Sequence, residues 1–250
     1  MDAEYARAYA NLYRHHWWWR AREDYLVGVL REWLPGGGHA RILDVGCGSG
    51  LFFERLGTLG EVRGVETDVS LRTGNPAIDG RIHWGPLDSL PPGESYTCIV
   101  MLDVLEHMSE PADALRQVRG RLAPGGLFLA TVPAFPLLWT HHDDVNHHVR
   151  RYTRGTLRPL LISTGFAPLE LRYFFHWTFP AKLLVRLAET VARRTRPPAV
   201  PPIPAAPVNR GLYWLSRLEQ RAFHRVHMPV GSSLLALAAP AELASAGQIS

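Results

Sequence analysis

The sequence predicts an α/β fold built on a doubly wound, mostly parallel β-sheet. The first observation is a short apolar segment, residues 42–45, that runs into a glycine turn and then into a helical pattern. The second is that further strand-like apolar segments alternate with helical segments along the chain. With 250 residues, 46% of them apolar, the chain is long enough for one sizeable α/β domain with additions, or for two small domains.

The glycine turn lies in the segment Arg41 to Gly50, RILDVGCGSG. Strand, turn and helix form the first unit of a doubly wound sheet, in which ligands bind at the carboxyl ends of the strands. Glycines at 46, 48 and 50 let a ligand approach the backbone closely. Their G-x-G-x-G spacing differs from the G-x-G-x-x-G of dinucleotide sites, and Asp44 suits a ligand with a cationic amine. A nucleotide site, or a turn without a ligand, is the alternative.

Glu66 ends the second predicted strand, about 20 residues after Asp44. An acid at this place can accept hydrogen bonds from two ribose hydroxyls, which favours an adenosine-type ligand without distinguishing NAD from others. The predicted strands span 42–45, 61–65, 81–84, 95–102, 127–132, 167–175 and 233–239. The predicted helical segments are 1–34, 112–122, 153–164, the later part of 173–192, and 212–226.

A dense polar segment, Trp139 to Tyr152, follows the fifth predicted strand on the ligand side of the sheet. Its sequence, WTHHDDVNHHVRRY, contains four His, two Asp, two Arg and one Tyr in 14 residues. Three interpretations stay open: a metal site, a His base with a carboxylate partner, or a lid fixed by Asp–Arg pairs. No metal signature is complete, so we predict no metal ligand.

An aromatic segment, His15 to Arg22, has the sequence HHWWWRAR. Three consecutive tryptophans cannot all face one core, because successive residues of a helix point about 100° apart. At least one should therefore lie against a ligand, a lid surface or a partner. The alternative is a helix that packs over the sheet by its aromatic side chains.

Several of these segments together resemble the class I S-adenosylmethionine (SAM) dependent methyltransferases, over a range from about His16 to Leu237. The resemblance implies SAM as the cofactor and a seven-stranded Rossmann-like sheet whose last strand is antiparallel beside the sixth. The matching segments are HHWWWRAR, DVGCGSG from Asp44, DVLEHM from Asp103, and a D-x-x-x-x-H-x-R-R-Y pattern at Asp143, His148, Arg150, Arg151 and Tyr152.

The resemblance also implies a set of cofactor-binding residues. Trp17 would attract the sulfonium by a cation–π interaction, and Arg20 would pair with the methionine carboxylate. Leu102 and Asp103 would lie along the cofactor, largely through their backbone. The full set is Asp44, Gly46, Cys47, Gly48, Gly50, Glu66, Asp88, Leu102, Asp103, His107, Trp17 and Arg20.

Catalytic residues are expected in the dense polar segment. SAM carries its own leaving group, so the protein need only hold the acceptor nucleophile in line and remove its proton. We expect His147 or His148, with Asp143 as its carboxylate partner, to act as the base. The expected acceptor-binding residues are Arg151, Tyr152 and His142.

We expect four parts in the chain: an N-terminal helical lid (1–38), a SAM-binding Rossmann-like core (39–175), a helical insertion with a proline-rich link (176–231), and the last strand (232–240). The insertion could cap the pocket, form a homodimer contact, or rest on a membrane surface near a lipid-linked acceptor. Burial against the domain is the simplest expectation.

Charge is unevenly distributed. Residues 1–149 contain 13 Arg and 19 acidic residues, net −6, whereas residues 150–250 contain 14 basic residues and 4 Glu, net +10. The basic half indicates either an anionic partner or a solvated basic face. Two cysteines exclude a disulfide framework, and neither a signal peptide nor a membrane-spanning segment is expected. We therefore expect a cytoplasmic protein, with membrane-peripheral contact as an option.

The predicted function is methyl transfer from SAM to O, N or an activated C of a small-molecule acceptor, which can be lipid-linked or sugar-linked. One alternative is a different SAM chemistry, such as cyclisation or elimination. Another is a non-catalytic binding module that uses the basic C-terminal half. No RNA-binding module signature is present, so nucleic acid is not an expected partner.

Overall fold

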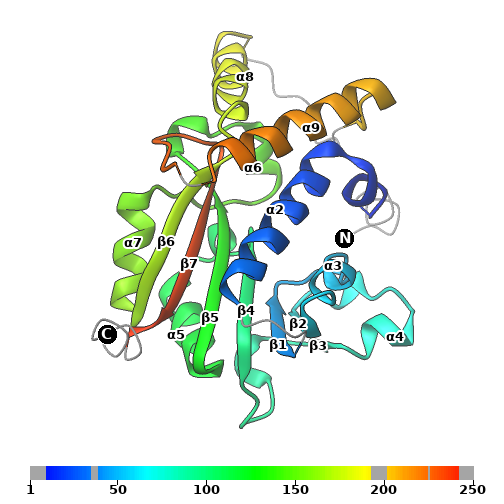
Figure 1. Cartoon of the computed structure of the whole chain (residues 1–250), viewed down its shortest axis with the longest axis vertical. Helices are drawn as coiled ribbons and strands as arrows, with labels where there is room; N and C mark the ends of the chain where they lie inside the picture. Colours follow the sequence, from blue (N-terminus) through cyan, green and yellow to red (C-terminus); the bar gives the residue numbers. More distant parts are fainter. Residues whose placement is uncertain (1–9, 35–38, 193–201, 225, 242–250) are drawn as a thin grey trace.

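The computed structural model describes residues 10–34, 39–192, 202–224 and 226–241, and a seven-stranded sheet forms its centre (Figure 1). The strand order is β3-β2-β1-β4-β5-β7-β6, so the order reverses between β1 and β4. Doubly wound sheets bind ligands at that reversal, outside the carboxyl ends of the strands. The strands are β1 (Ala40–Val45), β2 (Gly60–Glu66), β3 (Ile82–Trp84), β4 (Tyr96–Leu102), β5 (Leu122–Pro133), β6 (Phe166–Phe174) and β7 (Ser233–Pro240).

The pairing pattern confirms the predicted fold class. Strands β1 to β5 run parallel to one another, and β7 lies between β5 and β6, antiparallel to both. Strand β5 begins at Leu122, earlier than the predicted residue 127. Leu122 pairs with Tyr96 before a register shift, so the turn-like Pro-Gly-Gly sequence is accommodated within the strand, with Gly125 at φ 76°.

Helices cover both faces of the sheet, and α8 (Thr178–Ala192) stands beyond the strand ends (Figure 1). The other helices are α2 (Trp17–Trp33), α3 (Phe53–Leu56), α4 (Pro76–Asp79), α5 (Pro111–Arg121), α6 (His141–Val145), α7 (Arg154–Ser163) and α9 (Ala206–Ala222). Successive strand residues point to opposite faces. Ile42 therefore packs in one buried cluster with Leu26 of α2, while Leu43 packs in another with Leu115 of α5 and Leu157 of α7.

Helix α2 belongs to the segment predicted as a lid, and it is a layer of the core. Ala21, Leu26 and Leu30 are at most 1% exposed and pack with the strands beneath them. The Nδ1 atom of His16 accepts a hydrogen bond from the backbone N–H of Trp18 at 3.1 Å, which caps the helix. Residues 1–9 and 35–38 of the predicted lid lie outside the described residues. The four predicted part boundaries stay predictions.

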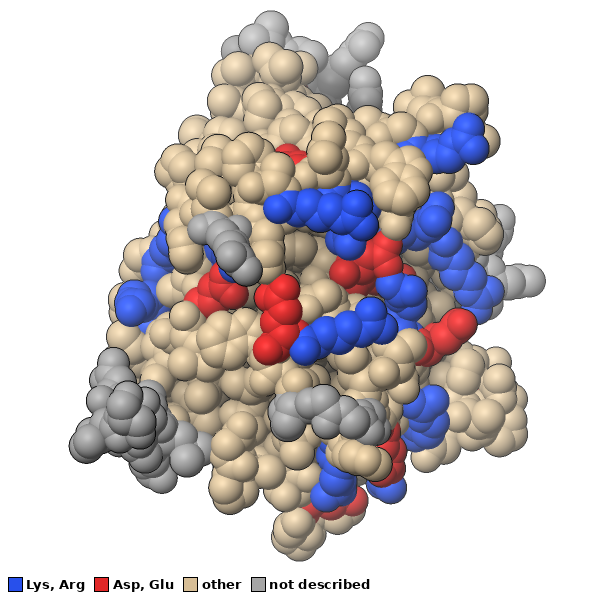
Figure 2. Space-filling model, in the orientation of Figure 1, with Lys and Arg blue, Asp and Glu red and all other residues tan. Residues whose placement is uncertain are grey.

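Helix α9, in the predicted insertion, packs against α2 through matched charges. The Tyr213 hydroxyl donates to Asp24 at 2.5 Å, and His224 Nε2 lies 2.9 Å from a carboxylate oxygen of Glu32. On the face drawn in Figure 2, basic side chains lie over α9 and α2 with acidic ones among them. Arg217 of α9 also lies 4.0 Å from Asp24 of α2, so part of the basic excess after residue 150 pairs with the acidic N-terminal half.

The outer faces of α8 and α9 are apolar and exposed. Leu184 and Leu187 on α8 are 67% and 53% exposed, and Trp214 and Leu218 on α9 are 55% and 66% exposed. The expected burial of the insertion against the domain is therefore wrong for these side chains. No helix among the described residues combines the length and the apolar character needed to cross a bilayer. Residues 193–201 of the predicted proline-rich link lie outside the described part.

Candidate active site

The turn after β1 requires glycine at the three predicted positions. Gly46, Gly48 and Gly50 have φ of 75°, 57° and 71°, in the left-handed region that favours glycine. A Cβ on Gly46 would lie 2.6 Å from Cγ2 of Val104, whereas nothing lies within 4 Å of a Cβ built on Gly48. The turn is thus packed at its first glycine and open at its second, where a ligand can approach the backbone.

Glu66, at the end of β2, holds this turn and its own loop together. Its Oε2 accepts the backbone N–H of Gly48 at 2.9 Å, and its Oε1 accepts the N–H groups of Thr67 and Asp68 at 2.8 and 2.9 Å. A carboxylate has about four acceptor positions, so three backbone donors leave capacity for a ligand hydroxyl. The predicted ribose acceptor is therefore also the residue that fixes the shape of the turn.

Asp44 lies at the end of β1 and is 3% exposed. Burial raises the pKa of Asp44 to about 7; Glu66 adds to the shift and Arg22 opposes it. A cationic ligand group beside this carboxyl would relieve the cost of its charge. The neighbouring Cys47 side chain turns inward, where a side chain on Gly64 would overlap its Sγ atom. Burial, and then Asp44, raise the pKa of the Cys47 thiol, so this thiol stays neutral.

A buried network joins α2 to the ends of β4 and β5. Nη2 of Arg22 lies 2.8 Å from Oδ2 of Asp103 and donates to Oγ1 of Thr131 at 2.6 Å. Thr131 Oγ1 in turn donates to Oδ1 of Asp103 at 3.1 Å. Asp103 has φ 57°, and its N–H donates to the carbonyl of Thr131, so backbone and side chain are both fixed. Leu102 precedes it at the end of β4.

The other predicted cofactor residues lie in different surroundings. The Arg20 guanidinium lies over the ring of Tyr213 on α9, 4.8 Å from its centroid, on the outer side of α2. Trp17 packs against Trp177, with ring centroids 5.2 Å apart, near the end of β6. Asp88 is exposed in the short 3₁₀ helix η2 (Leu87–Ser89) after β3. The structure therefore does not bring Arg20 or Trp17 to the glycine turn, and their cofactor roles stay predictions.

Asp143 organises the polar segment after β5. It is fully buried, and its carboxylate accepts hydrogen bonds from Arg151 Nε at 2.8 Å, Arg151 Nη2 at 2.9 Å and the N–H of Thr140 at 2.9 Å. His148 Nδ1 lies 2.8 Å from its Oδ1. Burial opposes the charge, but the bonds from His148 and Arg151 hold the pKa of Asp143 well below its usual range. Asp143 is therefore an ionised partner of His148.

His148 faces a second group of titratable side chains. Its ring lies edge-on to the ring of His107, with centroids 4.8 Å apart. Glu106 and His107 belong to the 3₁₀ helix η3 (Leu105–His107), which follows β4. Burial, and then Asp103, raise the pKa of Glu106 well above its usual value. Burial, and then His148, lower the pKa of His107.

These three residues are also a candidate metal group. Glu106, His107 and His148 each offer one ligand atom, and the three atoms lie within 4.8 Å of one another. Neither carboxylate oxygen of Glu106 has a hydrogen-bond partner among the described residues, although the side chain is fully buried. The prediction of no metal therefore stays open to test at this place.

Of the remaining predicted catalytic and acceptor residues, His142 and His147 are exposed, whereas Arg151 and Tyr152 are buried and hydrogen-bonded. His147, with φ 56°, is exposed, so the segment directs His148 and not His147 to Asp143. Arg151 is committed to Asp143 and to the carbonyl of Ala134, and the Tyr152 hydroxyl donates to the carbonyl of Leu105 at 3.1 Å. His142 lies in α6, where the side chain of Asn146 donates to its carbonyl at 2.7 Å. Arg151 and Tyr152 thus hold the segment against β5 and η3.

The residues of the turn fit the implied cofactor. The glycine turn is open at Gly48, the buried carboxyl of Asp44 gains from a cationic amine, and Glu66 retains acceptor capacity for ribose hydroxyls. SAM supplies an activated methyl group when it is bound. The chain would contribute the shaped backbone, Asp44 for the amine, Glu66 for the ribose hydroxyls, and the Asp143–His148 pair at the neighbouring strand ends.

Comparison with known proteins agrees with this geometry. A family profile described as methyltransferase domain matches residues 17–171, which is more than half of the chain. The chain therefore belongs to the methyltransferase domain family. Its fold is shared with solved SAM-dependent methyltransferases, so the match and the fold together identify a methyltransferase domain of the class I, SAM-dependent type.

Relatives with assigned functions are similar over part of the chain. The ubiquinone biosynthesis O-methyltransferase of Paraburkholderia xenovorans is 24% identical over 155 residues, which covers 55% of this chain and 61% of that protein. The protein of the same name from Xanthomonas campestris is 33% identical over 126 residues, which covers 46% of this chain and 50% of that protein. The chain thus spans less than two thirds of the length of these relatives.

Solved structures are similar in fold. A SAM-dependent methyltransferase from Archaeoglobus fulgidus has a TM-score of 0.55 at 15% identity, covering 86% of this chain and 93% of that one. The cyclase SpnF also has a TM-score of 0.55, at 20% identity, with coverage of 89% and 83%. Phosphoethanolamine N-methyltransferase 2 of Haemonchus contortus, in complex with SAM, has a TM-score of 0.54 at 18% identity, with coverage of 87% and 52%.

Two residues of the site were missed from the sequence. Arg20, and not Arg22, was predicted to bind the cofactor. Arg22, however, shares the 3–4 residue spacing of the buried side chains Tyr25, Leu26 and Val29. That periodicity places Arg22 on the inner face of α2 and Arg20 on the outer face. Glu106 was not predicted as a site residue, because no sequence signal shows that its carboxyl is buried.

Proposed function

We propose that the protein transfers the methyl group of SAM to a hydroxyl oxygen of a small-molecule acceptor, with His148 as the base. The observation that carries this proposal is the Asp143–His148 pair, joined at 2.8 Å, beside the strand ends that hold the glycine turn and Asp103. The O-methyltransferase names of the relatives support oxygen as the accepting atom.

The arrangement suits proton removal from a hydroxyl. Because Asp143 is ionised, its carboxylate accepts a hydrogen bond from Nδ1 of His148, so the neutral form of this imidazole would have its lone pair on Nε2. A neutral imidazole with an oriented carboxylate is the usual general base near neutral pH. Arg151 and the N–H of Thr140 hold the carboxylate in place, so the imidazole orientation is set before an acceptor arrives.

Calorimetry and product mass spectrometry test the proposal. We expect SAM and S-adenosylhomocysteine to bind, and Asp44→Ala and Glu66→Ala to weaken both. We expect incubation with phenolic and sugar-linked acceptors to give a product that carries one added methyl group. Binding of NADH without SAM, or an altered product without a methyl group, would refute the proposed reaction, the latter in favour of another SAM chemistry.

We also propose that the insertion brings the protein to a lipid surface near a lipid-linked acceptor. The exposed Leu184, Val185 and Leu187 of α8, with the neighbouring exposed Arg186, support this contact. Sedimentation with anionic vesicles should recover the protein, and Leu184→Ser with Leu187→Ser should reduce the recovery. If analytical ultracentrifugation instead shows a dimer, and the same two changes dissociate it, the exposed apolar face of α8 serves self-association.

A further inference from the structure

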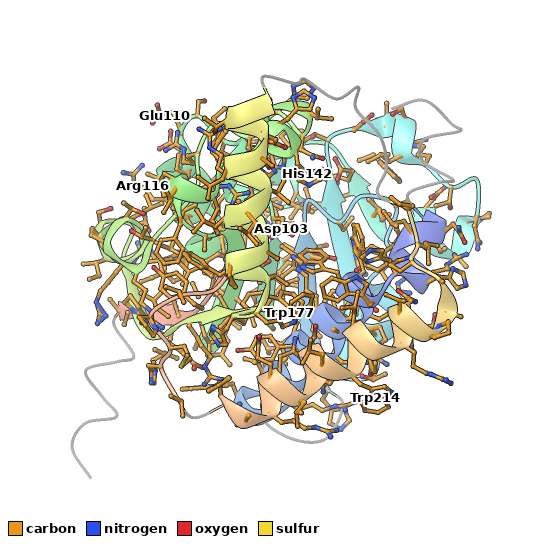
Figure 3. All side chains as sticks on the ribbon, turned by 90° about the horizontal axis from the view of Figure 1, so that it is seen from above. Asp103, Glu110, Arg116, His142, Trp177 and Trp214 are labelled. Atoms are coloured by element: carbon orange, nitrogen blue, oxygen red, sulfur yellow. The ribbon has the colours of Figure 1, made fainter. Side chains whose placement is uncertain are left out.

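One face of α8 is directed at the segment that carries the proposed base. The ring of Phe179 packs edge-on against Phe135, with centroids 5.4 Å apart, and Oε2 of Glu189 accepts the backbone N–H of His141 at 3.1 Å. Lys182 follows Phe179 by three residues and precedes Glu189 by seven, so the three side chains share one helix face. Viewed from above, α8 crosses the region where Asp103 and His142 are labelled (Figure 3).

The Lys182 ammonium lies among groups of the candidate active site. Burial, and then the Arg151 guanidinium, lower the pKa of Lys182 to about 8, whereas Asp143 and Asp103 act in the opposite direction. Lys182 in turn contributes, after burial, to a lowered pKa of His142. These interactions come from the segments after β4 and after β5. Lys182 therefore faces the place where an acceptor must lie to reach His148.

The charges around Lys182 leave it as a surplus cation. Asp143 is paired with Arg151, and Asp103 is paired with Arg22. Asp143 and Asp103, the two acids that act on Lys182, are thus each matched by an arginine. A partly buried ammonium without a matching anion is costly, and an anionic ligand would supply the missing charge.

We propose that Lys182 binds an anionic group of the methyl acceptor and thereby places the acceptor hydroxyl beside His148. The acceptor would carry a carboxylate or a phosphate in addition to the hydroxyl that is methylated. This inference rests on the proposed methyl transfer, since it names the chemical class of the acceptor for the same site. It assigns α8, which the core fold does not require, to acceptor recognition.

Chemical labelling reports on this residue directly, because Lys182 is the only lysine of the chain. The complex with S-adenosylhomocysteine is acetylated to a trace extent and analysed by peptide mass spectrometry. This measures the reactivity of the Lys182 amine separately from that of the N-terminal amine. Three probes distinguish the anion: 3,4-dihydroxybenzoate, phenyl phosphate and neutral catechol. We expect one anionic probe to protect Lys182 at a concentration about tenfold lower than catechol, as for a hydrogen bond to a charged group. Protection by neither anion, or equal protection by catechol, would overturn the proposal.

Variants separate recognition by Lys182 from general electrostatics. In Lys182→Met, the affinity of the protecting anion for the S-adenosylhomocysteine complex should fall about tenfold, and Lys182→Arg should restore part of it. Arg158→Met is the matched control, because Arg158 is an exposed cation on a different helix, α7; it should leave the affinity unchanged. An equal loss in this control, or no loss in Lys182→Met, would overturn the inference.

The cofactor affinity of the same variants shows which proposal fails. Normal S-adenosylhomocysteine binding by Lys182→Met shows that the protein is folded and that the cofactor site is intact. If that complex also binds the anion like the unaltered protein, the role of Lys182 is refuted and the proposed methyl transfer is untouched. If the unaltered protein binds no SAM, the proposed function itself fails.

Discussion

The proposed cofactor half and the proposed acceptor half of the candidate active site are built from different parts of the chain. The cofactor half consists of β1, the glycine turn and the end of β2, and its key contacts are backbone groups held by Glu66. The acceptor half consists of side chains from η3, the segment after β5 and α8, among them His107, His148 and Lys182. The first half is local in sequence, whereas the second exists only after distant segments pack together.

This difference predicts which measurement each change will affect. Changes in the turn should alter cofactor affinity, because the turn shapes the surface that binds it. Changes around Asp143 should alter stability or turnover, because Asp143 is both a buried ion-pair partner and the residue that orients His148. The following four predictions test this separation.

The largest effect is expected from Asp143→Ala. The change leaves the buried Arg151 guanidinium without its bidentate partner and removes the cap of α6, so the free energy of unfolding should fall by about 3–5 kcal/mol. Urea denaturation measures the loss. Asp144→Ala is the control, since Asp144 is exposed and its carboxylate accepts the indole N–H of Trp139 at 2.8 Å. Equal stability of the two variants would contradict the central role of Asp143.

Turnover should depend on His148 far more than on His147. His148→Ala should lower kcat about 100-fold, the usual contribution of a general base, with little change in SAM affinity. His147→Ala, at the exposed neighbour, is the control and should retain most of the activity. Equal losses of turnover and cofactor affinity would assign His148 to a structural role. Activity lost with EDTA and restored by a divalent cation would assign Glu106, His107 and His148 to a metal site instead.

Gly46→Ala should weaken cofactor binding without abolishing the fold. The new Cβ would lie 2.6 Å from Cγ2 of Val104 in a backbone with φ 75°, and such strain costs about 1–3 kcal/mol. Calorimetric affinity for S-adenosylhomocysteine should therefore fall about tenfold or more. Val104→Ala in the same protein should recover part of the loss by removing the overlap. Gly211→Ala, where nothing lies within 4 Å of the new Cβ, is the matched control.

The fold and the cofactor half could be predicted from the sequence because their signals are local. The period of apolar residues defined the strands, and the three glycines with Asp44 and Glu66 marked the ligand end of β1 and β2. Each of these features depends on a few consecutive residues. The antiparallel placement of β7 was available only from the family resemblance, because composition alone does not give strand order.

The acceptor half could not be resolved in the same way, because single dihedral angles and tertiary packing decide it. His147 and His148 are adjacent, and the left-handed backbone of His147 determines which ring meets Asp143. Arg22 could have been chosen over Arg20 from helix periodicity. Lys182 was conspicuous only as the single lysine, and nothing in its sequence neighbourhood shows that α8 crosses the strand ends.

The smallest effect expected is a pH dependence that belongs to the cofactor half alone. Burial raises the pKa of Asp44 to about 7, so in the free protein this carboxyl is neutral below that pH and ionised above it. Only the ionised form attracts a cationic amine, so S-adenosylhomocysteine affinity should fall as the pH drops below about 7 and approach a tenfold loss per pH unit. The amine of the ligand titrates identically with any variant, so the difference between the native protein and Asp44→Asn isolates this carboxyl. Native and variant profiles of equal slope between pH 6 and pH 8 would show that Asp44 does not meet the ligand amine, even if the turn around it binds the cofactor.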